Sequence, residues 1–271
     1  MNKKLLICCG DAPNQKALAN KIAEQYPVAG IIIEQKKTAS SSKVDTSLFR
    51  KVWDRFLFHS IYAAWKKLQQ EYDKQFPEWP STNLLKVDSI NSMEAVAFSK
   101  KIAPDLVIVS GTNLIKDPLL NIQAGIGIIN LHTGLSPYVK GGPNCTNWCI
   151  ANNDWHLAGN TIMWINSGID AGNIITTETI DIRSADSLYD AHKMVMEHAH
   201  ELYLKAIRYL LQGQPPYIAV DQSEFPNGKI FYTKMWTAEK RAALLRNWRN
   251  RSKVSLQPPP RTISLPDLSP K

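Results

Sequence analysis

Short apolar runs alternate with amphipathic stretches from the start of the chain to Ser110. Four runs have the length and the branched aliphatic content of buried strands: 3–10, 28–34, 84–87 and 104–110. Stretches 14–26 and 92–101 carry apolar residues at helical spacing. Buried strands that alternate with helices indicate a parallel sheet with right-handed crossovers. The pattern predicts an α/β fold with a Rossmann-like, mostly parallel sheet flanked by helices.

The pattern changes after Gly213. Up to that residue it predicts strands at 125–129, 160–166 and 173–182 and helices at 143–152 and 185–211. Beyond it we expect only a strand at 229–233 and a basic helix at 237–251, followed by a Pro- and Ser-rich end. The expected units are a main domain at 1–213, a small C-terminal strand/helix appendage at 214–256 and a disordered tail at 257–271.

One helical stretch interrupts the alternation of the main domain. A polar run at 36–43 precedes it, and we place this insertion at about residues 44–76. Its segment 47–75 is dense in aromatic residues: Phe49, Trp53, Phe56, Phe58, Tyr62 and Trp65. Such a stripe indicates packing on the body or on a partner, and the sequence leaves open whether it shapes an acceptor pocket or the face of a homodimer.

The net charge of +8 is unevenly distributed. From Lys234 onward there are nine basic residues and two acids, so this segment carries +7 and residues 1–233 carry only +1. A basic amphipathic helix is more often a solvated face or a dimer contact than a nucleic-acid arm. We therefore expect no nucleic-acid partner, although a protein that binds nucleic acid through this segment is the alternative from a different functional class.

Composition places the chain among ordinary globular proteins. It has 271 residues, of which 44% are hydrophobic, and no uninterrupted apolar run long enough to indicate a membrane span. The four cysteines Cys8, Cys9, Cys145 and Cys149 lack the spacing of a zinc site. We expect reduced thiols, no metal and a cytoplasmic protein.

Three polar residues are candidates for chemistry. Asn130 and His132 follow the buried run at 125–129 and, being two apart, point to the same side of an extended strand. Asp170 lies in the turn S-G-I-D-A-G between two strand-like runs. An amide and an imidazole can stabilise an oxyanion, and a carboxylate can accept a proton from an attacking amine. This set suits acyl transfer to an amine.

Each residue also has a purely structural interpretation. His132 taken alone fits a histidine satisfied in the core at the end of a strand. Asp170 taken alone fits an aspartate that forms the turn before Gly172. Neither residue by itself therefore establishes a function.

Together the motifs resemble a known family. N-L-H followed by L-S-P-Y-V-K-G, then N-W-C-I, A-G-N-T-I-M-W-I and G-I-D-A-G-N-I-I-T, is similar to the folate-dependent formyltransferases. That family has an Asn-x-His pair, a Ser-Leu-Leu-Pro-like loop that ends in Gly, and an Asp in a later Asp-x-Gly turn. Asp170 follows Asn130 at the interval that this family has. The resemblance covers residues 3–213 in organisation, and its specific motifs lie within 130–176.

The resemblance implies a role for each matching residue. Asn130 would bind the oxyanion, His132 would stabilise the tetrahedral intermediate, and Asp170 would set the charge of the imidazole and relay protons. The co-substrate would be 10-formyltetrahydrofolate, and the residues expected to contact it are Ser110, Gly111, Leu114, Ile115, Asn166 and Ile169. The residues expected to contact the acceptor are Gly134, Ser136, Pro137, Lys140 and Gly141, with the Lys140 ammonium beside an acceptor phosphate.

Departures from the family pattern bear on the acceptor. Gly134 and Ser136 stand where the family has Ser and Leu, and the first turn C-G-D-A-P-N-Q-K lacks the Gly-rich phosphate cradle of glycinamide ribonucleotide formyltransferases. The segment after Gly213 is too short for the tRNA-binding domain of methionyl-tRNA formyltransferases. The layout is similar to sugar-nucleotide N-formyltransferases, so we expect a nucleotide-linked amino sugar as acceptor. Another small amine, or hydrolysis of the formyl-folate, is the alternative within the family.

Overall fold

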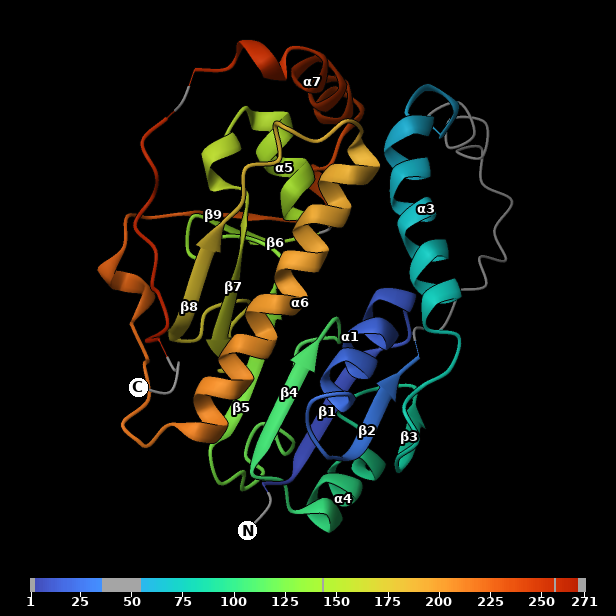
Figure 1. Cartoon of the computed structure of the whole chain (residues 1–271), viewed down its shortest axis with the longest axis vertical. Helices are drawn as coiled ribbons and strands as arrows, with labels where there is room; N and C mark the ends of the chain where they lie inside the picture. Colours follow the sequence, from blue (N-terminus) through green and yellow to red (C-terminus); the bar gives the residue numbers. More distant parts are fainter. Residues whose placement is uncertain (1–2, 36–54, 143, 256, 268–271) are drawn as a thin grey trace.

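A seven-stranded sheet forms the centre of the molecule in the computed structural model, which describes residues 3–35, 55–142, 144–255 and 257–267 (Figure 1). Its strands run in the order β3-β2-β1-β4-β5-β7-β8. Their bounds are β1 Leu5–Gly10, β2 Val28–Glu34, β3 Leu84–Val87, β4 Leu106–Ser110, β5 Gly127–His132, β7 Gly159–Trp164 and β8 Ile174–Thr179. A second, two-stranded sheet pairs β6 Val139–Gly141 with β9 Lys229–Phe231.

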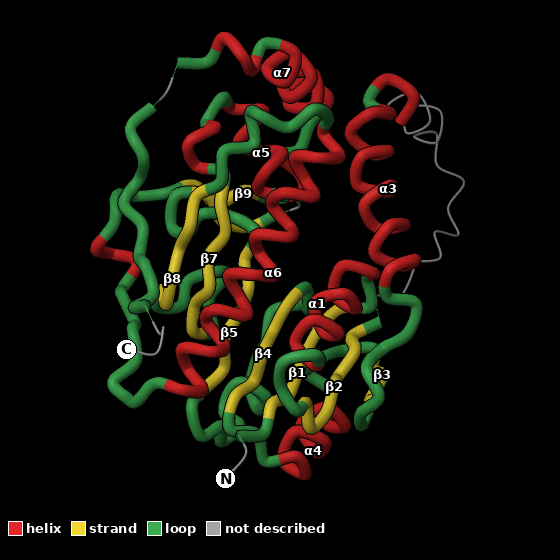
Figure 2. Tube along the Cα trace, viewed as in Figure 1, coloured by secondary structure: helices red, strands yellow, loops and turns green. Residues whose placement is uncertain are grey.

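Helices cover the sheet and connect its strands (Figure 2). The α-helices are α1 Pro13–Ala23, α3 His59–Gln75, α4 Met93–Ile102, α5 Cys145–Asn152, α6 Leu188–Gln212 and α7 Ala238–Arg249. Short 3-10 turns lie at η1 Trp155–Leu157, η2 Gln222–Glu224, η3 Thr233–Met235 and η4 Arg251–Lys253. Ser92, Asn144 and Ser187 each accept a backbone N–H at the start of their helix, which explains why α4, α5 and α6 begin where they do.

The sheet is buried on both faces, as the apolar runs predict. In β1, Leu5, Ile7 and Cys9 face a cluster that includes residues of α1 and α6, while Leu6 and Cys8 face a cluster that includes residues of α4. This alternation follows from the two-residue period of a strand. The predicted α/β fold is confirmed.

The sheet changes direction at β5. Strands β3, β2, β1, β4 and β5 run parallel, whereas β7 is antiparallel to both β5 and β8. The chain winds outward in one direction from β1 to β3 and in the other from β4 to β5. In open α/β sheets ligands bind at the carboxyl ends of strands near such a reversal of order. A ligand site is therefore expected at the carboxyl ends of β4 and β5.

The C-terminal appendage is integrated with the main domain. Its β9 pairs with β6, and the ring of Phe231 stacks on Trp148 of α5 with centroids 4.4 Å apart. Trp236 meets the same indole edge-on at 4.8 Å. The segment after Gly213 thus packs on the main domain, because β9 pairs with β6.

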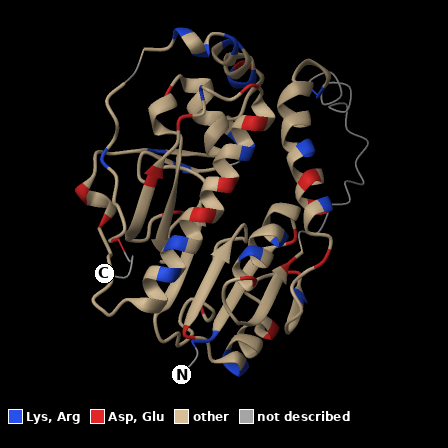
Figure 3. Cartoon of the chain, in the orientation of Figure 1, with Lys and Arg blue, Asp and Glu red and all other residues tan. Residues whose placement is uncertain are grey.

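Many basic side chains near the C-terminus have structural partners. Blue Lys and Arg positions gather on α7 and just after it (Figure 3). Lys240 donates to the Asn152 side chain at 2.8 Å, and Arg251 donates to the carbonyls of Arg183 and Ala185. These contacts attach α7 and η4 to α5 and to the segment before α6, so the charge of this region has a role in packing.

The aromatic helical stretch packs on the body. Residues 47–54 of that prediction lie outside the described residues, and α3 forms most of the remainder. Tyr72 on its inner face is buried against α1 and α6 and donates to Glu197 at 2.7 Å. Phe56 and Leu57, just before the helix, are exposed.

The prediction of an unpacked tail is wrong for residues 261–265. Thr177 of β8 donates its N–H to the Ile263 carbonyl at 2.9 Å, and Ile263 donates its own N–H to the Thr177 hydroxyl at 2.9 Å. Leu265 packs against the main core, and Arg261 stacks over Phe225. The segment covers the open edge of β8, where unpaired backbone groups otherwise face water.

Removal of this segment tests its contribution to stability. We expect truncation before Arg261 to lower the free energy of unfolding by about 1–3 kcal/mol, because it removes hydrogen bonds at the β8 edge and the burial of Leu265. Urea unfolding of the truncated and full chains measures the difference. Truncation before Pro266 retains the docked residues and is the control; equal stability of the two truncations would contradict the assignment.

Candidate active site

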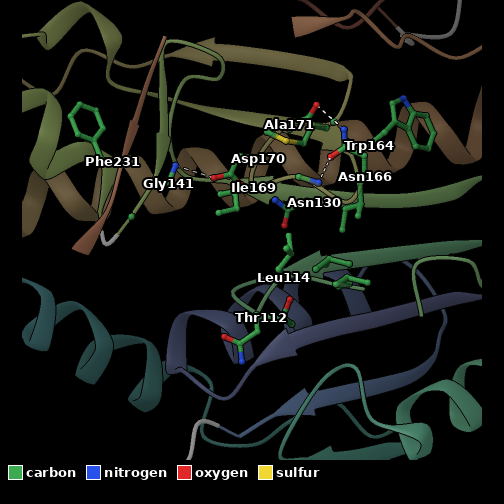
Figure 4. A pocket seen from close by; sticks show the side chains of 18 of the residues that line it. Thr112, Leu114, Asn130, Gly141, Trp164, Asn166, Ile169, Asp170, Ala171 and Phe231 are labelled. Carbon is green, nitrogen blue, oxygen red and sulfur yellow. Dashed lines mark hydrogen bonds between the residues drawn. The ribbon is translucent and has the colours of Figure 1, made fainter. Parts of the chain in front are cut away.

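A cavity of about 400 Å³ lies at the carboxyl ends of β4 and β5. The β4–β5 loop contributes Leu114 and Ile115, β7 contributes Met163 and Trp164, and the loop after β7 contributes Asn166 and residues 168–172. Gly141 of β6, the adjacent Gly142 and residues 231–233 of the appendage also line it. Figure 4 shows the Asn130 side chain between Asp170 and Leu114. The cavity therefore combines apolar walls with an amide and a carboxylate.

Asn130 reaches the cavity because β4 and β5 separate at this point. Their pairing ends at Val109 and Asn130. The hydroxyl of Tyr203, from α6, accepts the Val109 N–H at 3.0 Å and donates toward the Ile129 carbonyl at 2.9 Å. A buried side chain thus satisfies backbone groups where the strands diverge, and the divergence leaves space for a ligand beside Asn130.

The Asp170 carboxylate is positioned by its loop and by β6. Asp170 adopts a left-handed conformation with φ of 45°, which aspartate tolerates better than most residues. Its Oδ2 accepts the Gly141 N–H at 3.0 Å. Gln222 donates to the carbonyls of Asp170 and Gly172, both at 2.8 Å, and so holds the backbone of the turn. These contacts place the carboxylate at the cavity wall.

His132 lies directly behind Asp170 and does not line the cavity. Its Nδ1 is 3.4 Å from Asp170 Oδ2, and its Nε2 is 3.1 Å from the Val139 carbonyl oxygen and 3.6 Å from Cys145 Sγ. The ring is 8% exposed. Both nitrogens contact protein groups, so in this arrangement the imidazole acts on the cavity through Asp170.

The surroundings of His132 favour its charged form. Burial by itself lowers the pKa of His132, but negative charge at Cys145 and Asp170, together with hydrogen bonds to Cys145 and Val139, raises the pKa to about 9. The Val139 carbonyl and the Asp170 carboxylate are acceptors, which a doubly protonated ring satisfies at both nitrogens. The site therefore contains an imidazolium–carboxylate pair at neutral pH.

Four of the six residues predicted to contact the co-substrate line the cavity: Leu114, Ile115, Asn166 and Ile169. Ser110 is buried at 4% exposure, and neither it nor Gly111 lines the cavity.

The sequence analysis did not predict the role of Glu34 in holding the loop after β4. The buried Glu34 of β2 accepts the backbone N–H of Asn113 at 2.6 Å and its side-chain amide at 3.1 Å, which fixes the loop that carries Leu114.

The residues predicted to contact the acceptor do not all lie at the cavity. Gly141 lines the cavity, whereas Gly134, Ser136 and Pro137 are buried away from it. Ser136 is fully buried, with its N–H donated to the Thr161 hydroxyl at 2.9 Å. For these three residues the expectation of acceptor contact is corrected, because the loop packs inward against β7.

Lys140 does not line the cavity either. Its ammonium donates to Gln222 Oε1 at 3.3 Å, so the predicted placement beside an acceptor phosphate is not what the structure has. Successive residues of a strand face opposite sides, and in β6 it is Gly141 that reaches the cavity. Lys140 instead supports the glutamine that holds the Asp170 turn.

Sequence reasoning missed the contribution of the appendage to the cavity. Phe231, Tyr232 and Thr233 line it because β9 pairs with β6, a contact between residues 229–231 and 139–141. Gly141, at φ of 84°, is where a side chain would meet the Phe231 carbonyl. No local pattern marks such a pairing; only the glycine pair Gly141–Gly142 hinted at a close backbone approach.

Neither a metal cluster nor a membrane-spanning helix occurs in the part of the chain that the structure describes. No group of three or more His, Cys, Asp or Glu side chains among these residues is arranged to hold a metal ion. None of the helices within the described ranges is long and apolar enough to cross a membrane.

Comparison with known proteins identifies the family. A family model described as "Formyl transferase" matches residues 61–207, which is more than half of the chain. The chain belongs to the formyl transferase family. The match includes Asn130, His132 and Asp170, the three residues on which the resemblance was based.

Proteins similar to this chain include methionyl-tRNA formyltransferases and sugar N-formyltransferases. A methionyl-tRNA formyltransferase of Clostridium tetani is 32% identical over 120 residues, covering 44% of this chain and 38% of that protein. A sugar N-formyltransferase from Shewanella shares the fold, with a TM-score of 0.55, 17% identity and coverage of 90% and 87%. A sugar 3N-formyltransferase solved with dTDP and 5-N-formyltetrahydrofolate has a TM-score of 0.54 and 18% identity, and the match covers 92% of this chain and 80% of that protein. The chain spans 38% to 53% of the length of the first curated relatives that it matches.

The raised pKa of His132 predicts a pH-dependent stability. The folded-state pKa, about 9, lies above the ordinary 6.5, so the stabilisation is complete below pH 6.5 and is lost as pH rises through 9. We expect the free energy of unfolding of the wild type to decline over this range relative to that of His132→Gln. Urea unfolding at a series of pH values measures both curves, and parallel curves would contradict the charged pair.

Proposed function

We propose that this protein transfers a formyl group from 10-formyltetrahydrofolate to the amine of a nucleotide-linked amino sugar. The observation that carries the proposal is that Asn130 and Asp170, which pairs with His132, line one cavity in a member of the formyl transferase family. We place the reaction in the cytoplasm, because all four cysteines are free thiols.

Formyl transfer to an amine requires stabilisation of an oxyanion and removal of a proton from the amine, and these residues can provide both. Negative charge develops on the formyl oxygen, and the Asn130 amide is a neutral donor positioned in the cavity to stabilise it. The attacking amine must lose a proton, and the Asp170 carboxylate is the acceptor that lines the same cavity. The His132 imidazolium lies 3.4 Å from Asp170 Oδ2 and can take part in relaying that proton to the departing folate nitrogen.

The cavity walls fit a folate. Its volume of about 400 Å³ lies in the range of small-molecule sites. Leu114, Ile115 and Ile169 supply apolar surface for a flat ring, and the loops that carry them supply backbone N–H and carbonyl groups for the polar edge of a pterin. When bound, 10-formyltetrahydrofolate supplies the activated formyl group; the protein supplies orientation, charge stabilisation and the proton acceptor.

Two observations bear on the acceptor. The appendage contributes Phe231 and Tyr232 to the cavity, an aromatic wall suited to a nucleotide-linked substrate, and the sugar N-formyltransferase folds match about nine tenths of the chain. The curated sequence relatives are methionyl-tRNA formyltransferases, which makes methionyl-tRNA the second candidate. We favour the amino-sugar nucleotide, because residues 231–233 of the appendage form an aromatic part of the cavity wall.

An acceptor assay distinguishes these candidates. Purified protein with 10-formyltetrahydrofolate is incubated separately with nucleotide-linked amino sugars, with methionyl-tRNA and without an acceptor, and products are followed by mass spectrometry. We expect one formyl group to be added to an amino sugar nucleotide. Formylation of methionyl-tRNA alone would overturn the sugar acceptor, and folate hydrolysis without acceptor formylation would overturn transfer itself.

Substitutions in the polar set test the assigned roles. We expect Asp170→Asn and His132→Ala to abolish transfer, and Asn130→Ala to lower kcat about 10²–10³-fold, the usual effect of removing one oxyanion donor. His156→Ala, a histidine of η1 that does not line the cavity, is the matched control. Steady-state kinetics with a thermal unfolding check separates rate from stability, and near wild-type turnover in Asp170→Asn would refute the mechanism.

A further inference from the structure

Four groups beside the cavity form a closed ring of polar contacts: one ion pair and three hydrogen bonds. His132 Nδ1 is 3.4 Å from Asp170 Oδ2, which accepts the Gly141 N–H at 3.0 Å. The Gly141 carbonyl in turn accepts from Cys145 Sγ at 3.4 Å, and the same sulfur is 3.6 Å from His132 Nε2. The ring joins β5, β6, α5 and the loop after β7, and Cys145 is the member for which the mechanism above has no role.

The direction of each hydrogen bond follows from the groups that can only accept. The Asp170 carboxylate accepts from Gly141 and forms an ion pair with His132 Nδ1, and the Val139 carbonyl accepts from Nε2–H. The Cys145 thiol donates to the Gly141 carbonyl and turns its lone pairs toward Nε2–H. Each hydrogen bond of this set has a donor and an acceptor when the His132 ring is protonated at both nitrogens. Among the described residues, Asp170 and Cys145 are the titratable groups that contact the imidazole.

The loop is shaped to bring Cys145 against His132. A side chain at position 134 would place its Cβ 2.5 Å from His132 Nε2 and 2.8 Å from Cys145 Sγ. A serine, which the resembling family has at this position, does not fit beside that contact. Gly134, which the sequence marked as a departure from the family, therefore makes room for the sulfur.

The sulfur is also held in place from its own helix. Cys145 is the first residue of α5 and is 3% exposed. The adjoining backbone is fixed because Trp148, one turn along, donates its indole N–H to the Gly142 carbonyl at 3.3 Å. Cys145 thus contacts the imidazole from one side and the peptide of Gly141 from the other, with little freedom to move away.

We propose that Cys145 is a positioning residue for formyl transfer, which orients the His132 imidazolium and the Gly141 peptide so that Asp170 faces the cavity as a carboxylate. The inference rests on the proposed function. The thiol forms no bond with the formyl group, because it does not line the cavity. Its effect reaches the reaction through Gly141 N–H and through the charge of His132.

The chain offers a matched control. Cys149 lies on the same helix, is 2% exposed and packs in the same apolar cluster as Cys145. Among the described residues, no hydrogen bond joins Cys149 to the side chains of His132 and Asp170 or to the Gly141 peptide. Cys149→Ala therefore creates a buried cavity of the same kind as Cys145→Ala and leaves the ring intact.

The test compares Cys145→Ala, Cys145→Ser and Cys149→Ala with the wild type. We expect Cys145→Ala to lower kcat about tenfold with KM for both substrates within about twofold, since the loss is in the reacting geometry. The pKa of His132, read by NMR titration and assigned with His132→Gln, should fall, because Cys145 raises it. Cys145→Ser should restore kcat, because a hydroxyl also donates and accepts.

The outcomes separate this inference from the proposed function. An unchanged kcat and His132 pKa in Cys145→Ala, or an equal loss in Cys149→Ala, overturns the inference. If Cys145→Ala does not fold, Cys145→Ser decides: a wild-type kcat supports the role of a donor and acceptor, and a lowered kcat overturns it. If the wild type formylates no acceptor, the proposed function fails, while the histidine titration still tests the contact.

Discussion

The Asp170 carboxylate is the point at which three separate parts of the chain meet. It accepts a hydrogen bond from Gly141 of β6 and pairs with His132 of β5, while its own carbonyl is held by Gln222 from the segment after α6. A left-handed aspartate costs free energy, and hydrogen bonds of this kind offset the cost by about 0.5–1.5 kcal/mol each. The cavity depends on these contacts, because they hold the turn at residues 168–172, which forms one of its walls.

The same contacts explain why the appendage belongs to the site. Lys140 and Gly141 are neighbours in β6, and they serve opposite sides of the strand: Gly141 faces Asp170, and Lys140 faces Gln222. Pairing of β6 with β9 then brings Phe231 to the cavity. A formyl transferase core that ended at Gly213 would lack both the glutamine and the aromatic wall. The aromatic wall and the geometry of the carboxylate are therefore coupled through one short strand.

On the opposite wall, the site depends on the divergence of two parallel strands. Tyr203 is fully buried and satisfies the backbone of β4 and β5 where their pairing stops. Glu34 performs a related task for the loop after β4, since it accepts two hydrogen bonds from Asn113. Both side chains lie outside the cavity, and both hold backbone beside it in a fixed shape. Ordinary packing residues thus determine where Asn130 and Leu114 stand.

The sequence by itself determined the order of strands and helices, the parallel core and the identities of Asn130, His132 and Asp170. Those features are local: apolar runs of strand length, two-residue spacing in β5 and a glycine-flanked turn can all be recognised from neighbouring residues. Tertiary structure alone decided that β9 pairs with β6, that residues 261–265 cover the edge of β8, and that Cys145 contacts His132. These contacts join residues whose proximity depends on the packing of whole elements, and a strand as short as β9 or an extended tail carries no periodic signal of its own. The inward packing of Ser136 and the turn of Lys140 toward Gln222 were missed for the same reason: the direction of a loop side chain is set by the surface against which the loop packs.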